Sequence, residues 1–332
     1  MSVVRRAARS GLLLAAAVLC GAVPALAQAG SGPGVDGARL AFRIHDERVV
    51  ESSGLALSRT HPGLAYTVND SGDDARVLVL SLRDGSAVGE TTLTGAENDD
   101  FEALAPAPGG RLLVGDIGDN DAERDSIEVY VLDEPGRGAA EVEPRTVSLT
   151  YADGPRDAEG LVVRGQRVFV VSKEALGGVY AAPVLGSARE AYRLRRVASA
   201  PGVVTDAAQL ADGDVVLRDY RRGYVVEMPG WRVRASFPLP RVQQGETLAA
   251  ALDGRRAYAG TEGEDSPVYL VPVPAAAESA PASVPPARSS SQQQEEQWSW
   301  LRPTGYAAAA AAAVVIGVLL RRRRRRPRIQ IR

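Results

Sequence analysis

Short apolar segments separated by turn residues follow one another between residues 38 and 274. Five stretches share one order, in which an apolar segment, a tight turn, a second apolar segment, a loop and a third apolar segment succeed each other. In the first stretch these segments are SSGLALS at 52–58, LAYTVND at 64–70 and RVLVLSL at 76–82. Short apolar runs bounded by glycine, proline, asparagine and aspartate are typical of β-strands, and no long helical period is visible.

The other four stretches repeat this order at similar distances. Their segments are 101–107, 111–120 and 127–135; 158–165, 167–174 and 178–184; 205–213, 214–220 and 224–230; and 246–254, 256–265 and 266–273. A polar residue marks the same place in each first segment, with spacings of 49, 57, 47 and 40 residues between Ser53, Glu102, Glu159, Asp206 and Glu246. A repeat of about 48 residues is typical of a four-stranded propeller blade.

A more polar fourth strand follows the third segment, as in RTVSLTY at 145–151 and AYRLRRVAS at 191–199. The fifth repeat lacks this strand, and the apolar segment ARLAFRI at 38–44 stands before the first repeat. That segment can complete the last blade, because ring closure removes unpaired strand edges. The sequence therefore predicts an all-β protein with a five-bladed β-propeller at 38–274. Six blades is the alternative, if the 57-residue interval holds two units, and a β-sandwich is less favoured.

The N-terminus is typical of a secretory signal. Residues 1–27 contain an arginine-rich start, an apolar run and the motif Ala25-Leu26-Ala27, so we expect a mature protein that begins at Gln28, with a linker at 28–37. Cys20 is the only cysteine and lies within the signal, so no disulfide framework is expected.

The C-terminus predicts a membrane anchor. Residues 275–304 are rich in alanine, proline, serine and glutamine, a composition typical of a disordered stalk. An uncharged run at 305–320 predicts one transmembrane helix, and the arginine-rich tail at 321–332 should stay in the cytoplasm. We expect an exported, single-pass membrane protein with its N-terminal ectodomain outside. LRPTG at 301–305 resembles the sortase motif LPxTG, so wall anchoring at Thr304 is the alternative.

The balance of charge excludes one class of partner. The two termini carry eleven arginines and no acids, which leaves 28 basic against 41 acidic groups between them, a net charge of −13. An acidic body argues against nucleic acid, because phosphate binding needs a basic face. We expect a monomer that binds an unidentified extracellular ligand or protein.

Acidic residues gather where first segments start and second segments end, and in a propeller both places lie at one mouth of the central channel. Carboxylates brought together in this way recruit a cation or have raised pKa values, and calcium suits such hard oxygen ligands best. Turn capping by the same residues is the alternative reading. The candidate ring consists of Asp70, Asp100, Glu102, Asp116, Asp119, Asn120, Glu159, Asp206, Glu246 and Glu262.

Two pairs of short motifs carry a family resemblance. DAEGL at 157–161 with VSKE at 171–174 resembles the secreted propellers called esterase-like phytases, and DFEALA at 100–105 with VGDIGDN at 114–120 is similar to related actinobacterial propeller proteins. The resemblance implies a propeller fold and calcium-assisted hydrolysis of phosphoesters or esters. The residues that would act are Asp157, Glu159, Lys173 and Glu174.

Two functions follow from these observations. The first is a non-enzymatic surface propeller that binds a ligand or protein, with calcium at the acidic end of its channel. The alternative is a calcium-assisted hydrolase of phosphoesters, esters or lactones. The fold hosts both functions, so only the site can distinguish them.

Overall fold

The computed structural model describes residues 35–186 and 188–275. These residues form β-strands and one short 3-10 helix, η1 (Val184–Gly186), and no α-helix. The strands are β1 (Arg39–Ile44), β2 (Ser52–Leu57), β3 (Leu64–Asn69), β4 (Arg76–Ser81), β5 (Ala87–Leu93), β6 (Phe101–Ala107), β7 (Arg111–Asp116), β8 (Ile127–Asp133), β9 (Gly138–Val142), β10 (Arg145–Tyr151), β11 (Ala158–Arg164), β12 (Arg167–Ser172), β13 (Gly178–Ala182), β14 (Ala191–Ser199), β15 (Asp206–Gln209), β16 (Val215–Arg218), β17 (Arg222–Glu227), β18 (Arg232–Pro238), β19 (Leu248–Ala250), β20 (Arg256–Ala259) and β21 (Ser266–Pro272).

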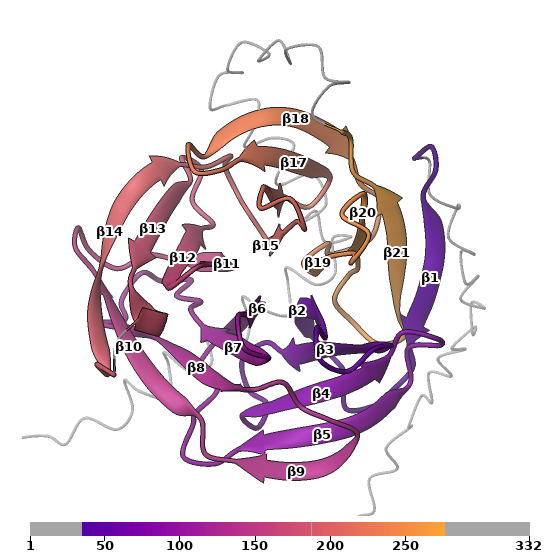
Figure 1. The fold of residues 1–332 in the computed structure, drawn as a ribbon, viewed down its shortest axis with the longest axis horizontal. Helices are drawn as coiled ribbons and strands as arrows, with labels where there is room; N and C mark the ends of the chain where they lie inside the picture. The colour runs from indigo at the N-terminus through magenta and orange to yellow at the C-terminus, as the bar shows by residue number, and fades with distance from the viewer. Residues whose placement is uncertain (1–34, 187, 276–332) are drawn as a thin grey trace, which may run out of the picture.

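The strands form antiparallel sheets around a central axis, with β2, β6, β11, β15 and β19 innermost (Figure 1). The first strand of each repeat pairs with the second and the second with the third, as in β2-β3-β4 and β15-β16-β17. The fourth strand then adds to the outer edge, as β5 and β18 do. The predicted all-β architecture is therefore present, and the three apolar segments of each repeat are its inner strands.

Burial follows the position of each strand in its sheet. All six residues of β2 are buried, because an inner strand lies between two neighbouring sheets. The outer strand β5 alternates between buried and partly exposed residues, since only one of its faces meets the core. This difference explains why the inner strands have continuous apolar sequences and the fourth strands have mixed ones.

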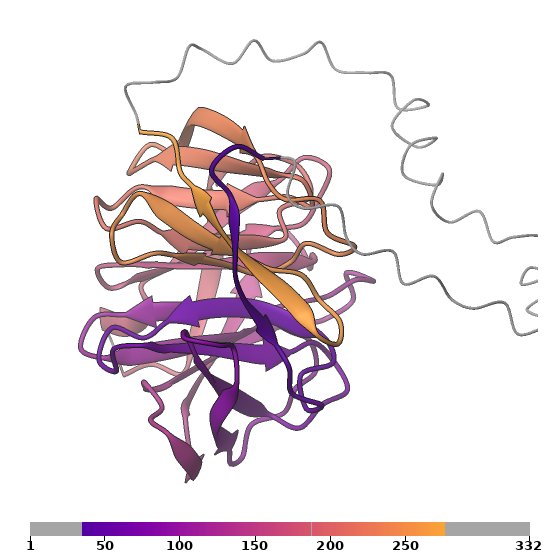
Figure 2. The ribbon, with the colours of Figure 1, turned by 90° about the vertical axis from the view of Figure 1, so that its right-hand side faces the viewer.

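The N-terminal strand joins the last sheet. β1 pairs antiparallel with β21, with Arg39 opposite Leu270 and Ile44 opposite Ser266. Figure 2 shows the indigo β1 running beside the orange β21. The sequence predicted this pairing from the missing fourth strand of the fifth repeat, and the structure confirms it.

The core is divided into clusters of buried apolar side chains between consecutive repeats. One cluster, for example, joins Leu113 of the second repeat to Leu161 of the third. The cluster that contains Phe42 and Ile44 of β1 also holds Leu55 of the first repeat and Val268 of the fifth. Packing therefore continues from the last repeat to the first, and the arrangement closes on itself.

One element was not predicted. β9, at Gly138–Val142, pairs in parallel with the outer strand β5 and lies within the long interval between the anchors Glu102 and Glu159. β10 also pairs in parallel with β14, which joins the sheets of the second and third repeats. The extra residues of the longest interval are therefore used by an added edge strand.

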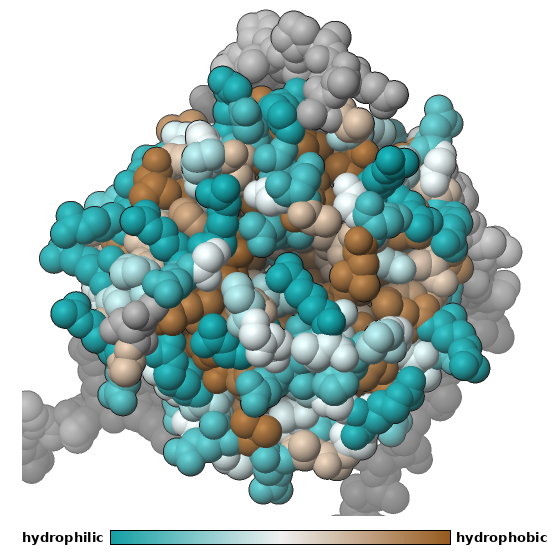
Figure 3. Space-filling view, viewed as in Figure 1, coloured by the Kyte–Doolittle hydropathy of each residue, from teal (hydrophilic) through white to brown (hydrophobic). Residues whose placement is uncertain are grey.

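Residues near the centre of the ring surround an internal space. A cavity of about 350 Å³ is lined by the first strands of all the repeats, with Leu55, Leu104, Leu161, Ala208 and Leu248 among its walls. Figure 3 shows that hydrophilic residues cover most of the rim of one face and that hydrophobic residues form small patches between them.

The predicted signal peptide, most of the linker, the stalk, the membrane helix and the basic tail lie outside the described residues. Within residues 35–186 and 188–275, no helix is long and apolar enough to cross a membrane.

Candidate metal centre

Strand pairing brings the predicted acids to one end of the ring. The start of each first strand lies opposite the end of the second strand, as in Ser52 opposite Asn69, Phe101 opposite Asp116 and Asp206 opposite Arg218. Residues just outside these pairs therefore meet at the same place. We call this end the acidic mouth and define it by Asp70, Asp100, Glu102, Glu159, Glu246 and Glu262.

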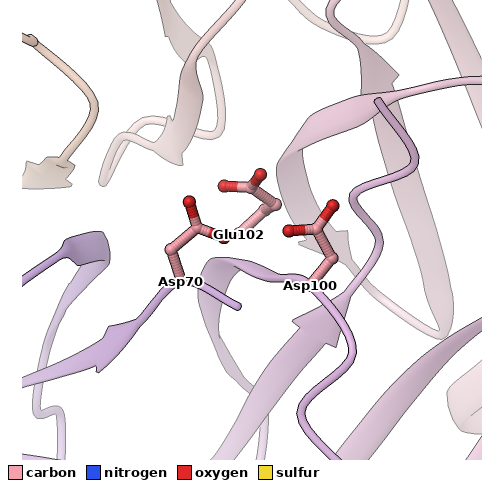
Figure 4. A group of neighbouring side chains, drawn as sticks. All are labelled: Asp70, Asp100 and Glu102. Atoms are coloured by element: carbon pink, nitrogen blue, oxygen red, sulfur yellow. The ribbon is translucent and has the colours of Figure 1, made fainter. Parts of the chain in front are cut away.

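Three of these acids form a compact group, which we call the metal triad: Asp70, Asp100 and Glu102. One carboxylate oxygen of each lies within 4.8 Å of the others, and Figure 4 shows the three carboxylates turned toward one another. Asp70 follows β3, Asp100 precedes β6 and Glu102 belongs to β6. Two neighbouring sheets thus each place carboxylates at one point.

Burial and nearby carboxylates raise the pKa values of two members of the metal triad, Asp100 and Glu102. Burial, followed by the nearby Asp70, raises the pKa of Asp100 to about 7. Glu102 is 4% exposed, and burial together with the charge of Glu159 raises its pKa well above the ordinary value. Its carboxylate accepts a hydrogen bond of 2.7 Å from the Ser53 hydroxyl. The ionised triad therefore lacks a sufficient positive partner among the described side chains.

Glu159 belongs to β11, the inner strand next to β6, and is 2% exposed (Figure 1). Its Oε1 forms an ion pair with the Lys173 ammonium, whereas its Oε2 is buried and has no hydrogen-bond partner among the described residues. Burial raises the pKa of Glu159 well above the ordinary value, although Lys173 acts in the opposite direction. The charge of Glu159 in turn raises the pKa of Lys173, despite burial.

The fifth repeat contributes two further carboxyl groups to the acidic mouth. Burial is the main cause of the raised pKa of Glu246. Burial and the charge of Glu246 raise the pKa of Glu262 to about 7. The fourth and fifth repeats are also connected by Arg218, which donates hydrogen bonds of 2.8 Å to the Thr247 carbonyl and 3.0 Å to the Gly260 carbonyl.

Asp206 is fully buried, and its surroundings give it a structural role. Its carboxylate accepts hydrogen bonds from the backbone N–H groups of Ala207 and Leu248. Burial raises its pKa well above the ordinary value. Because Leu248 begins the first strand of the next repeat, Asp206 connects two neighbouring sheets.

Two predicted ligands, Asp116 and Asp119, hold a loop together instead of joining the metal triad, and a third, Asn120, follows them. Asp116 accepts hydrogen bonds of 2.7 Å from Arg124 and 3.0 Å from the backbone N–H of Asp100. Asp119 caps the same loop by accepting hydrogen bonds from the backbone N–H groups of Glu123 and Arg124. Asn120 is exposed. Here the turn-capping alternative describes the observed contacts of Asp116 and Asp119.

The four residues that the family resemblance implied are only partly together. Glu159 and Lys173 are in contact, and Asp157 accepts a hydrogen bond of 3.1 Å from the backbone N–H of Asp119. Glu174 instead forms an ion pair of 3.2 Å with Arg156 and accepts a hydrogen bond from Ser172. The contacts of Glu174 therefore lie outside the Glu159–Lys173 pair.

Sequence reasoning missed two residues of this region. Arg124 binds Asp116, and the ring of Tyr220 has its centre 5.7 Å from the Lys173 ammonium. Arg124 lies in a loop eight residues after its partner, and no spacing rule connects the two. Tyr220 lies two residues after the end of β16, and its aromatic side chain gave no signal in a search for acidic ligands.

A hard divalent cation fits this donor set. Calcium prefers carboxylate and carbonyl oxygens, and the metal triad offers three carboxylates at one point. The buried Glu159 Oε2 has no hydrogen-bond partner among the described residues, but Glu159 is not part of this group of three. The raised pKa values of the carboxyl groups indicate that a positive charge is missing here, and such a cation would supply it.

Comparisons with known proteins give likenesses of fold alone. No family model and no curated protein matches the chain. Among solved structures, the Myxococcus xanthus glutaminyl cyclase has 13% identity and a TM-score of 0.47, with 71% of this chain and 97% of that chain covered. A gluconolactonase from Xanthomonas campestris has 14% identity and a TM-score of 0.44, with 73% and 96% covered. The Dos1 propeller has 12% identity and a TM-score of 0.37, with 68% and 59% covered.

The sheets around a central axis define the chain as a β-propeller protein. The resemblance to esterase-like phytases stays a prediction, because no sequence comparison matches it to a family.

Proposed function

We propose that the protein is a five-bladed β-propeller that binds calcium at the acidic mouth and, through that mouth, an extracellular ligand or protein. The observation that carries the proposal is the metal triad, whose three carboxylates converge within 4.8 Å. The blade count is supported by the continuous packing from the fifth repeat to the first and by the use of the longest interval for β9.

The place of action in this proposal is the cell surface. The N-terminal signal and the apolar run before the arginine block support export and anchoring by one C-terminal helix. The stalk at 275–304 would then hold the propeller away from the membrane. The acidic body supports a cationic or metal-bridged partner and argues against nucleic acid.

Calcium-dependent stability tests the proposal. The full-length chain, purified in detergent, is unfolded by heat in EDTA and in millimolar calcium. A site held at 100 times its dissociation constant adds about 2.7 kcal/mol, which for a domain of this size raises the melting temperature by roughly 5–10 °C. An unchanged melting temperature together with no calcium uptake in equilibrium dialysis would reject the calcium site.

A second candidate function is calcium-assisted hydrolysis of esters or lactones. The contact between Lys173 and the buried Glu159 at the acidic mouth favours it. A cation there can polarise a carbonyl, and a buried carboxyl can move a proton. Phosphoesters are less favoured, because carboxylates outnumber the basic groups at the acidic mouth.

The hydrolase candidate is tested with a panel of esters and lactones in calcium. Turnover that disappears in Glu159→Gln, while the melting temperature in calcium stays within a few degrees, would support it. Glu174→Gln is the matched comparison, since Glu174 pairs with Arg156 and not with Lys173. If no ester or lactone of the panel is turned over, the hydrolase candidate is rejected and only the binding function remains.

A further inference from the structure

The cavity on the propeller axis reaches the end of the ring opposite the acidic mouth. Its walls include the last residues of inner strands, such as Leu57 of β2, Gln209 of β15 and Ala250 of β19. These ends lie beside the starts of the second strands, since Leu57 pairs with Ala65 and Ala250 with Ala257. We call this end the arginine mouth and define it by the turns at 58–64, 107–111, 164–167, 210–214 and 251–256.

The walls of the cavity are mostly apolar. Four inner strands contribute a leucine each, namely Leu55, Leu104, Leu161 and Leu248. Leu252 extends the apolar wall to the surface, where it is 66% exposed. Among the described residues that line the cavity, only Arg59 carries a charge and only Gln209 adds another polar side chain. A volume of about 350 Å³ with apolar walls and few polar groups is typical of a small-molecule site.

Arginines outnumber acids in the turns of the arginine mouth. These turns contain six arginines and three aspartates, although the chain between the termini is acidic as a whole. Asp214 forms an ion pair with Arg234, which lies outside the turns, and Asp253 pairs with Arg256. Four arginines of these turns have no ion-pair partner among the described residues, namely Arg59, Arg164, Arg167 and Arg255. The end of the cavity is therefore suited to an anionic group.

A buried acid near Arg59 does not neutralise the Arg59 side chain. Glu134 accepts hydrogen bonds from the backbone N–H groups of Arg59 and Thr60. The hydroxyl groups of Ser58 and Thr60 donate to the same carboxylate. Although burial opposes the change, these hydrogen bonds lower the pKa of Glu134. The charge of Glu134 is thus stabilised by backbone and hydroxyl donors, and the exposed Arg59 guanidinium is left for a ligand.

We propose that the cavity binds a small amphipathic carboxylate, with its apolar chain between the inner strands and its carboxylate on the Arg59 guanidinium. A neutral hydrophobic ligand would not use the arginines, and a small hydrophilic anion would leave the apolar walls in water. The planar guanidinium suits a carboxylate because it offers two parallel donors. The site needs no metal ion and lies at the other end of the channel from the metal triad, so it adds a second function to the one proposed above.

Binding of octanoate to the full-length chain tests this site. The chain is held in phosphatidylcholine nanodiscs, and bound octanoate is counted by equilibrium dialysis in EDTA, with empty nanodiscs as the blank. We expect a single saturable site. Octanamide, which lacks the charge, should bind about fivefold to tenfold more weakly. Acetate should bind roughly a hundredfold or more weakly, because it lacks the methylene groups that the cavity buries.

Variants locate the two parts of the ligand. Arg59→Gln should weaken octanoate by about fivefold to tenfold and leave octanamide unchanged, so the preference for the charged probe disappears. Arg232→Gln is the matched control, since Arg232 is exposed on the outer strand β18 and pairs with Glu227. Ala250→Phe should block both probes, because Ala250 lines the cavity and is partly exposed, which leaves room for a larger side chain.

The outcomes distinguish this site from the acidic mouth. Absence of saturable octanoate binding by wild type would overturn the site, and so would equal effects of Arg59→Gln and Arg232→Gln. Octanoate binding that requires calcium would place the carboxylate on a metal ion at the acidic mouth and reject the cavity. If Ala250→Phe does not fold, the comparison of Arg59→Gln with Arg232→Gln decides alone. None of these results depends on whether the metal triad binds calcium.

Discussion

At the scale of single residues, Glu102 has opposite effects on stability with and without a cation. Its buried carboxyl has a raised pKa, so the ionised form is costly in the metal-free protein. We expect Glu102→Gln to equal or exceed the wild type in melting temperature in EDTA and to lose the gain of about 2.7 kcal/mol that saturating calcium provides. Thermal unfolding in both conditions measures the two effects.

Glu134 provides the control for this experiment. It is also buried, but it lies outside the acidic mouth, and its carboxylate accepts hydrogen bonds from Ser58 and Thr60. Glu134→Gln should lose about 1.5–3 kcal/mol of unfolding free energy, because hydrogen bonds to a charged group are lost, and should keep its response to calcium. If calcium stabilises Glu102→Gln and Glu134→Gln equally, the metal triad is not the calcium site.

Glu262 predicts how stability depends on pH. Its pKa is about 7 in the folded protein against an ordinary 4.5, so the folded state binds its proton more tightly than the unfolded chain does. The resulting stabilisation is present below about pH 4.5 and is lost as the pH rises through 7. Metal-free protein should therefore become less stable across this window.

Urea unfolding at several pH values in EDTA measures this slope. Glu262→Gln should make it shallower, whereas Glu143→Gln, at an exposed position between β9 and β10, should leave it unchanged. Identical slopes for wild type and Glu262→Gln would contradict the prediction.

At the scale of elements, β1 should contribute strongly to stability although it lies far in sequence from the sheet that it completes. Ile44 is 1% exposed and packs between the first and last repeats. Ile44→Ala should therefore cost about 2–5 kcal/mol, the usual range for a buried aliphatic side chain. Leu40→Ala on the same strand should cost far less, since Leu40 is 44% exposed. Similar small losses for both variants in urea would mean that β1 does not close the ring.

The same elements explain how much the sequence could predict. Inner strands such as β6 were predictable because burial on both faces produces a continuous apolar run between turn residues. The strand β9 was missed, because its residues GAAEV are mostly exposed and have neither an apolar run nor an alternating pattern. Its pairing with β5 is a tertiary feature that no local signal announces.

The candidate site, too, was only partly predictable from the sequence. Strand order led us to expect Asp70, Asp100 and Glu102 at one mouth together with seven other residues, but the repeat pattern did not single out these three. The separation of Asp116 and Asp119 from the metal triad depends on Arg124 and on backbone N–H groups of the loop. An aspartate that caps a turn and an aspartate that binds a metal ion cannot be told apart in the sequence. Only the positions of their partners in the structure distinguish the two roles.

At the scale of the whole molecule, the distribution of charge separates the propeller from its ends. All the acids lie between the termini, which carry eleven arginines and no acidic residue. An acidic propeller is repelled by anionic lipid, and a basic tail is attracted to it. The two parts are therefore suited to opposite relations with a membrane, and the tail is the part expected to stay on its cytoplasmic side.

Cell fractionation tests this arrangement. The intact chain should remain with the membrane and dissolve in detergent, whereas a chain that ends at residue 275 should be released into the medium, because it lacks the apolar run and the arginine block. The released protein should keep the calcium response, since the metal triad lies wholly within it. If the intact chain instead stays with the cell wall after detergent and has lost the residues beyond Thr304, sortase-type anchoring replaces the membrane helix.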